Sequence, residues 1–380
     1  MAHFSLLVIV VIITALAFDF TNGFHDTANA MATSIATGAL RPKVAVLLSG
    51  VLNLVGAFLS TKVAQTISSG IVNDRLATPA IIFAGLVGAI LWNLATWLFG
   101  LPSSSSHALF GGLIGAVWVG AGMNGVHFDQ VISKILLPAV ASPIIAGVAA
   151  LIATYLAYRI SRRARKEVVT SGFRHGQTIS ASLVSLAHGT NDAQKTMGVI
   201  TLTLIATGAL AAGSSPPYWV IASAGLAIGL GTYAGGWRII RTMGNRLTDI
   251  APPQGFAAET SSTAVILSSA NLGFALSTTH VVAGSILGTG LGRGRLAEVR
   301  WSVAGQMALA WLLTLPAAAA VGGIAAAVAV RGTLGVVMIG LVALAVAVGV
   351  YALSRREPVN SDNVNDLAPA HTQRQTLGTT

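Results

Sequence analysis

Acidic side chains interrupt two long apolar stretches of the chain. The segment "DFTNGFHDTANAMATS" (19–34) follows an apolar run and contains Asp26, and "HGTNDAQKTM" (188–197) contains Asp192 in similar surroundings. A carboxylate within the hydrocarbon region of a bilayer is energetically costly, and such residues usually serve a function. We therefore expect Asp26 and Asp192 to hold a coupling cation or a proton, that is, one whose binding is coupled to that of a second ligand. We also name both residues as candidate metal ligands.

The two acidic segments also align with each other. When Asp26 is superimposed on Asp192, Asn29 stands opposite Lys195, and both positions join our candidate coupling site. An ammonium three residues after an aspartate lies on the same helix face. Lys195 therefore either takes the place of a bound sodium ion or only compensates the charge of Asp192. The polar residues beside the two aspartates, to which we assign a supporting role, are Asn22, His25, His188 and Asn191.

A second pair of motifs carries clustered hydroxyl groups. "SSSHALFGGLIG" (104–115) and "STTHVVAGSILG" (277–288) share a first serine, a histidine and two glycines at matching positions. Each cluster precedes a short apolar segment, and a helix N-terminus presents free N–H groups that favour an anion. Backbone N–H groups and hydroxyls can hold an oxyanion without a full opposite charge and can release it again. The candidate oxyanion ligands are Ser104, Ser105, Ser106, Ser277, Thr278 and Thr279.

Three further polar residues each allow two interpretations. His107 and His280 could carry protons, because imidazole titrates near neutral pH, or they could hydrogen-bond their own loops and hold the hydroxyl clusters in place. Glu259 precedes "TSST" at the start of an apolar segment. It is either a coupling carboxylate or an acidic residue that stabilises the start of a helix.

The composition defines the elements that must position these residues. The chain has 380 residues, of which 54% are hydrophobic and 9% charged, with a mean hydropathy of +0.75. A soluble domain would carry roughly a quarter charged residues. The chain has no cysteine, so it has neither disulfides nor thiolate metal sites. We predict an all-α polytopic protein of the lipid bilayer, and the net charge of +10 reflects basic loops rather than nucleic-acid binding.

The apolar segments predict about eleven crossings (about 10–12), counting the short segments near the hydroxyl clusters as re-entrant or half-length pieces. Two spanning elements are expected to be broken, at 21–25 and at 187–191, where Gly23 and Gly189 permit an interruption. The predicted organisation is a first transmembrane repeat (1–158), a basic cytoplasmic linker (159–176), a second transmembrane repeat (177–330), an additional transmembrane helix (331–353) and a disordered cytoplasmic tail (354–380).

The distribution of basic residues predicts the orientation. With the N-terminus outside and the C-terminus in the cytoplasm, only Lys62, Arg75, Lys134 and Arg331 fall outside, while Lys195 lies within a membrane segment. This asymmetry obeys the positive-inside rule. An odd number of crossings in each repeat makes the two repeats inverted. Inverted repeats with interrupted helices at matching positions are typical of secondary transporters, whose site lies near the bilayer midplane.

At these motifs the chain resembles the inorganic phosphate transporter (PiT) family, whose duplicated signature contains a G-x-N-D element. It stands here as "GFHD" (23–26) and "GTND" (189–192), and "WNLATWLFGLPSSSSH" (92–107), "HGTNDAQKTMG" (188–198) and "LSTTH" (276–280) resemble the bacterial low-affinity branch. The resemblance implies a homodimeric inverted-repeat protein of the cytoplasmic membrane. It implies proton-driven import of inorganic phosphate, carried as a neutral complex with a divalent metal. No cofactor is implied.

Two departures from the family pattern concern the coupling ion. His25 replaces the signature asparagine, and Lys195 stands where sodium-coupled relatives have asparagine, while Glu259 matches a family carboxylate. Both departures favour protons over sodium. The alternatives are a sodium-coupled phosphate symporter and a sulfate permease of the same fold. A distant third is an intramembrane hydrolase, for which the chain lacks a recognisable pair of nucleophile and base.

Overall fold

The computed structural model describes residues 5–293 and 299–366, and within them the chain is helical, with two isolated β-bridges. Short 3₁₀ or π turns lie at Met123–Gly125, Ile132–Leu136 and Thr242–Arg246. The α-helices are α1 (Leu6–Ala36), α2 (Pro42–Gly56), α3 (Lys62–Gly70), α4 (Pro79–Phe99), α5 (Ser105–Ala121), α6 (Phe128–Val131), α7 (Leu137–Ser161), α8 (Lys166–Ala206), α9 (Tyr218–Ala234), α10 (Trp237–Arg241), α11 (Pro252–Asn271), α12 (Thr278–Gly292), α13 (Trp301–Ala329) and α14 (Thr333–Ser354).

Local signals set many helix ends. Pro42, Pro79 and Pro252 stand in the first turns of α2, α4 and α11, where a missing N–H leaves no intrahelical bond unmade. Gly100 has φ +64° and ends α4, a conformation that costs glycine little. Ser104 caps α5. The positions of these ends follow from residue types that the sequence displays directly.

Among the described residues, five helices are long and apolar enough to cross a membrane: α1, α4, the helical stretch Phe128–Ser161, α13 and α14. A sixth candidate is Tyr218–Ala234 with Trp237–Arg246, which meet at a bend of 61°. The chain is therefore a multi-pass membrane protein, but these helices do not confirm about eleven crossings. Part of the reason is that α2, α5 and α12, whose segments were counted as crossings, have only 15, 17 and 15 residues. A helix needs about 20 apolar residues to cross a bilayer.

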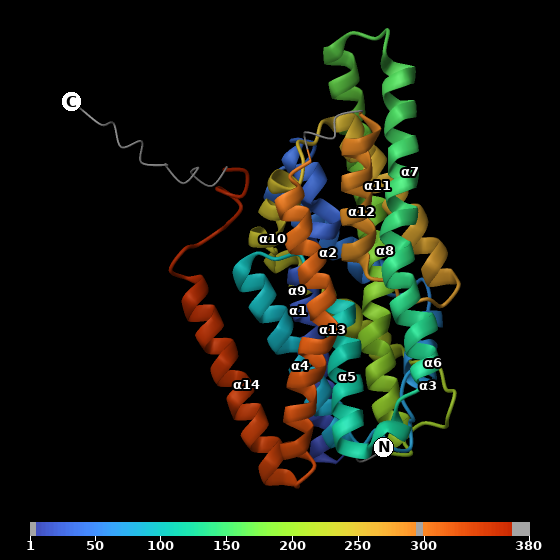
Figure 1. Ribbon diagram of the computed structural model, residues 1–380, viewed down its shortest axis with the longest axis vertical. Helices are drawn as coiled ribbons and strands as arrows, with labels where there is room; N and C mark the ends of the chain where they lie inside the picture. Colours follow the sequence, from blue (N-terminus) through green and yellow to red (C-terminus); the bar gives the residue numbers. More distant parts are fainter. Residues whose placement is uncertain (1–4, 294–298, 367–380) are drawn as a thin grey trace, which may run out of the picture.

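The helices form an elongated bundle in which the two halves of the sequence interlock (Figure 1). The short helix α5 packs against α13, and its counterpart α12 packs against α7. Likewise α1 packs on α9 and α8 packs on α2. The helices α5 and α12 run in opposite directions from the middle of the bundle, and α14 lies at its outer edge (Figure 1). Corresponding helices of the two halves thus have corresponding partners.

The prediction that two helices break near Gly23 and Gly189 was wrong. Both α1 and α8 are continuous through these positions. A Cβ atom on Gly23 would lie 2.4 Å from the carbonyl oxygen of Ile228, and one on Gly189 would lie 2.2 Å from that of Asn53. Both glycines therefore serve close helix packing, on α9 and α2 respectively, rather than an interruption of the backbone.

Gly189→Ala should destabilise the protein by about 1–3 kcal/mol, because the added methyl group must displace the α2 backbone. Gly172 lies in the same helix with no neighbouring atom within 4 Å, so Gly172→Ala is a matched control. That control should be neutral or stabilising by up to about 1 kcal/mol, since alanine favours helices. Thermal unfolding of both purified variants in detergent measures the difference, and equal stabilities would contradict the packing role of Gly189.

Two segments outside the bundle differ from simple loops. Most of the basic linker expected at 159–176 is helical, since α7 ends at Ser161 and α8 begins at Lys166. The tail was expected to be disordered, but its first residues contact α10. Arg238 of α10 donates to the carbonyl oxygens of Ser354, at 3.0 Å, and Glu357. Residues 355–366 therefore lie against α10 and the turn that follows it. The remainder of the tail, 367–380, lies outside the described residues.

Candidate functional site

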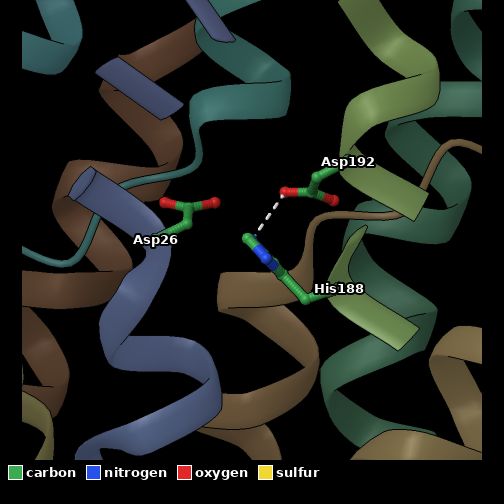
Figure 2. A group of neighbouring side chains, drawn as sticks. All are labelled: Asp26, His188 and Asp192. Carbon is green, nitrogen blue, oxygen red and sulfur yellow. Dashed lines mark ion pairs between the residues drawn. The ribbon is translucent and has the colours of Figure 1, made fainter. Parts of the chain in front are cut away.

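The two signature carboxylates meet at the interface of α1 and α8. Asp26, His188 and Asp192 each offer one ligand atom, and these atoms lie within 4.8 Å of one another. Their side chains point toward one another across the space between the two helices (Figure 2). All three are almost completely buried. Residues separated by more than 160 positions in the sequence thus form one charged centre.

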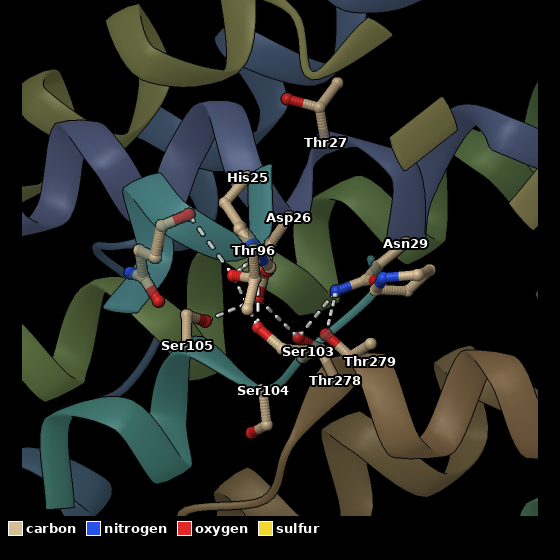
Figure 3. Close-up of polar contacts among 12 residues, drawn as sticks. His25, Asp26, Thr27, Asn29, Thr96, Ser103, Ser104, Ser105, Thr278 and Thr279 are labelled. Carbon is tan, nitrogen blue, oxygen red and sulfur yellow. Dashed lines mark hydrogen bonds and ion pairs between the residues drawn. The ribbon is translucent and has the colours of Figure 1, made fainter. Parts of the chain in front are cut away.

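Asp26 is compensated by an imidazole and by hydroxyls from both short helices. The Nδ1 atom of His25 lies 2.6 Å from its Oδ1 atom. Ser105 at the start of α5 donates to its Oδ2 atom at 2.7 Å, and Thr278 at the start of α12 does so at 3.4 Å. Figure 3 shows these contacts converging on one carboxylate. The first turns of α5 and α12 are therefore joined through Asp26.

Asp192 is paired with a fully buried lysine. The Nζ atom of Lys195 lies 2.6 Å from Asp192 Oδ1, and the same ammonium contacts the hydroxyl of Ser106. His188 Nε2 lies 3.2 Å from Asp192 Oδ2, and Asn191 donates to Oδ1 at 2.7 Å. Since Lys195 cancels the charge of Asp192, the centre with neutral histidines retains one negative charge, that of Asp26.

The hydroxyl clusters lie at helix N-termini, as expected, and divide into two groups. Ser104 and Ser277 accept the backbone N–H groups of His107 and His280, at 3.1 and 3.3 Å, so their side chains form the helix caps. The other four hydroxyl residues, Ser105, Ser106, Thr278 and Thr279, lie in the first turns beyond the caps. Asn29 donates to the hydroxyls of Thr278 and Thr279, at 3.1 and 3.0 Å (Figure 3).

The two motif histidines lie against each other with tilted rings. The ring centroids of His107 and His280 are 4.8 Å apart, and the ring of His280 lies 4.2 Å from that of Trp311. His280 Nδ1 lies 3.1 Å from the carbonyl oxygen of Ala139. This contact anchors α12 to the start of α7. The acceptor lies on α7, so the expected bond of His280 to its own loop is not the one observed at Nδ1, whereas proton transfer by the two histidines stays a prediction.

Glu259 lies apart from the centre, in a shell of its own. Thr33 donates to its Oε1 atom at 2.6 Å, Gln177 donates to the same oxygen at 3.1 Å, and Ser180 donates to Oε2. The residue is 3% exposed and lies in the second turn of α11, and both interpretations of it stay predictions. The structure thus places Glu259 between α1 and α8, near the end of α1 that follows Asn29.

Sequence reasoning did not identify several residues that support the site. Thr96 lies 3.1 Å from His25 Nε2, and Ser103 lies 3.3 Å from the same nitrogen. Asn53 of α2 orients His188, at 3.1 Å from Nδ1. The available signal was the presence of polar side chains within apolar segments. That signal does not say which of them face one another, because the contacts join distant segments.

The arrangement has the chemistry of an anion site beside a cation site. Free N–H groups and four hydroxyls at two helix starts suit an oxyanion. Two carboxylates and an imidazole within reach of one another suit a proton or a metal ion. The ammonium of Lys195 joins the two groups of ligands, since it contacts both Ser106 and Asp192. These opposite charges can bind an anion and a cation together inside the bundle.

A multi-pass helical bundle with such a buried polar centre, assembled from two similar halves, is the architecture of a membrane transporter. A family model described as "Phosphate transporter family" matches residues 22–322. The chain belongs to this family, which is one of transporters rather than enzymes.

Several relatives are similar along most of their length. The chain is 55% identical over 362 residues to a "Probable low-affinity inorganic phosphate transporter" of Mycobacterium bovis, covering 94% of this chain and 87% of that protein. A protein of the same printed name from Mycobacterium leprae is 56% identical over 363 residues, covering 95% and 87%. The one from Bacillus subtilis is 42% identical over 322 residues, covering 84% and 96%.

A solved structure described as "The sodium-dependent phosphate transporter" has a similar fold, with a TM-score of 0.75. It is 24% identical in sequence, and the match covers 84% of this chain and 98% of that one. This likeness establishes the fold of the chain.

Proposed function

We propose that this protein imports inorganic phosphate across the cytoplasmic membrane by proton symport. The observation that carries the proposal is the convergence of two hydroxyl-rich helix starts on a carboxylate, through Ser105 and Thr278 at Asp26. Phosphate would bind the free N–H groups of α5 and α12 and the four hydroxyl residues of the first turns, with Ser105 and Thr278 turning their hydroxyl protons from Asp26 to the anion. Family membership and the names of the relatives support phosphate as the substrate.

The buried ion pair supports protons as the coupling ion. Lys195 already occupies the cation position beside Asp192, at 2.6 Å. The remaining negative charge at Asp26 lies 2.6 Å from the imidazole of His25, and imidazole is a group that can accept and release protons. We further propose that the two halves are inverted repeats with the N-terminus outside. This arrangement accords with the opposite directions of α5 and α12 (Figure 1). Homodimer formation stays a prediction.

The deciding experiment is uptake of labelled phosphate by proteoliposomes containing the purified protein. An inward proton gradient without sodium should drive accumulation, whereas an inward sodium gradient at equal pH should not. Liposomes without protein give the background. Uptake that requires sodium, or labelled phosphate fully displaced by excess sulfate, would contradict the proposal and favour the sodium-coupled or sulfate alternative.

A second candidate keeps phosphate as the substrate but carries it with a divalent metal. The cluster of Asp26, His188 and Asp192 favours this possibility, because two carboxylates and an imidazole can hold such an ion. In the same proteoliposomes, metal-coupled transport predicts that EDTA stops uptake and that Mg²⁺ or Mn²⁺ restores it. Radioactive manganese should then enter together with phosphate, and uptake indifferent to EDTA would exclude this candidate.

Removing one hydroxyl should weaken phosphate binding without unfolding the protein. Ser105→Ala and Thr278→Ala should each raise the KM for phosphate, since a lost hydrogen bond to a charged ligand costs about 1.5–3 kcal/mol. The matched control is Thr260→Ala, which removes an exposed hydroxyl of α11. Uptake kinetics at varied phosphate concentration measure the effect, and an unchanged KM in both variants would contradict the proposed anion site.

A further inference from the structure

A stripe of polar side chains runs along α1 and continues past the site on both sides. Asp19, Asn22, Asp26, Asn29 and Thr33 follow one another at intervals of three and four residues, which places them on one face of the helix. All five are at most 3% exposed. A helix that spans a bilayer normally has apolar residues at most of these positions. The stripe therefore indicates a polar path along α1 inside the bundle.

The stripe has three acidic levels. Asp26 and Asp192 form the middle one, and Glu259, bonded to Thr33, forms the level toward the end of α1. Asp19 lies seven residues before Asp26, about 10 Å along the helix axis in the opposite direction. The hydroxyl of Thr196, four residues after Asp192 on α8, is its neighbour there. Asp19 belongs to neither the proposed phosphate site nor the candidate metal cluster.

Asp19 differs from the other buried acids in its surroundings. Asp26, Asp192 and Glu259 each have donors within hydrogen-bonding distance. Asp19 is 0% exposed, and neither of its carboxyl oxygens has a hydrogen-bond partner among the described residues. Its polar neighbours are the side chains of Asn22 and Thr196, which lie close enough to interact with it but form no hydrogen bond of good geometry within that part of the chain. Three adjacent polar groups thus lie buried and unsatisfied together.

The charged groups near Asp19 do not compensate it. On α8 they are Asp192 and Lys195, and that lysine is engaged with Asp192 and Ser106. On α1 itself His25 is paired with Asp26. The helices α4 and α9, which also pack on α1, contain no Asp, Glu, His, Lys or Arg. An ionised carboxylate in this position would be a buried charge without a compensating opposite charge of its own, which is strongly unfavourable.

We propose that Asp19 is a proton-binding site that is loaded and unloaded during transport, separate from the centre at Asp26 and Asp192. A proton neutralises the buried carboxyl group and lets it donate to Asn22 or Thr196. Its place on the polar stripe gives the proton a route toward the centre along α1 and α8. The assignment of Asp19 to the transport cycle rests on the proposed phosphate import by proton symport.

Two measurements on wild type, Asp19→Asn and Asp19→Glu test the proposal. The first compares, in proteoliposomes, accumulation of labelled phosphate driven by a proton gradient with phosphate–phosphate exchange in the absence of a gradient. The second is infrared difference spectroscopy of the purified protein without phosphate, which reports protonated carboxyl groups directly. The matched control is Asp129→Asn, which removes an exposed carboxylate of α6.

Asp19→Asn should lose gradient-driven accumulation relative to exchange, and Asp19→Glu should retain part of it. The spectrum of the wild type should contain a protonated-carboxyl band that is absent from Asp19→Asn and present in Asp129→Asn. Full gradient-driven accumulation by Asp19→Asn would show that the carboxyl group is only structural and would overturn the proposal. A band that disappears when sodium is added at constant pH would also overturn it, in favour of a sodium site.

Failure of the proposed function is recognised separately. If wild-type uptake ignores the proton gradient, proton symport is wrong, and with it the assignment of Asp19 to the transport cycle. The infrared band needs neither phosphate nor a gradient. The band therefore tests, independently of transport, whether Asp19 binds a proton. If the wild type lacks the band, the proposal that Asp19 binds a proton is overturned as well.

Discussion

Asp26→Asn is expected to abolish phosphate uptake while leaving the protein folded. The amide keeps the shape of the side chain but removes the one negative charge that Lys195 does not cancel. It also ends the ion pair with His25 at 2.6 Å, so this position can no longer take up a proton and offers a metal ion only a neutral amide oxygen. Because Asp26 accepts from Ser105 and Thr278, its charge also aligns the first turns of α5 and α12.

Asp192→Asn should abolish uptake too, but with a cost in stability that Asp26→Asn does not share. The change leaves the ammonium of Lys195 buried without its carboxylate, and breaking a buried pair in this way costs about 3–5 kcal/mol. The double variant Asp192→Asn with Lys195→Met should regain stability, since both charges are then absent. It should remain inactive, because the carboxylate is still missing.

Uptake assays and thermal unfolding of the same preparations separate these outcomes. Asp362→Asn, a change of an exposed tail residue, provides the control for handling and reconstitution. Near-normal uptake by well-folded Asp26→Asn would refute the assignment of this carboxylate to coupling. Equal stability of the two single variants would contradict the proposed energetic role of the pair between Asp192 and Lys195.

Wild-type uptake should be unchanged when choline replaces sodium, and Lys195 is the expected reason. Its ammonium lies 2.6 Å from Asp192 and is completely buried. At an effective dielectric constant of about 20, two like charges about 4 Å apart repel by about 4 kcal/mol. That repulsion weakens binding of a sodium ion at this position roughly several-hundred-fold.

Two substitutions distinguish the charge of Lys195 from its volume. Lys195→Asn removes the charge and supplies an amide oxygen, as Asn29 does in the first half. This variant should have low uptake without sodium, and added sodium should restore it. Lys195→Met removes the charge without supplying a ligand, so sodium should not restore its uptake. The measurement is initial phosphate uptake at increasing sodium under a constant proton gradient. If the wild type stops working without sodium, Lys195 is only a counter-ion of Asp192 and proton coupling is wrong.

The sequence alone determined the class of protein and the residues that are able to bind ions or protons. Acidic residues in apolar stretches, hydroxyls before short apolar segments and their duplication are visible without coordinates. The starts of α5 and α12 lie at the expected serine and threonine clusters, because a helix cap depends on residues only three positions apart. Membership of the phosphate transporter family, expected from the same motifs, was confirmed.

Only the tertiary structure decided how these residues are used. Gly23 and Gly189 look like helix breakers in sequence, yet their role is set by carbonyl groups of α9 and α2 that no local pattern reveals. Asp19 stands in the same polar segment as Asp26, and only the folded chain distinguishes the uncompensated carboxyl group from the paired one. The physical reason is that burial and pairing depend on contacts between segments far apart in the chain, whereas capping and hydropathy depend on near neighbours.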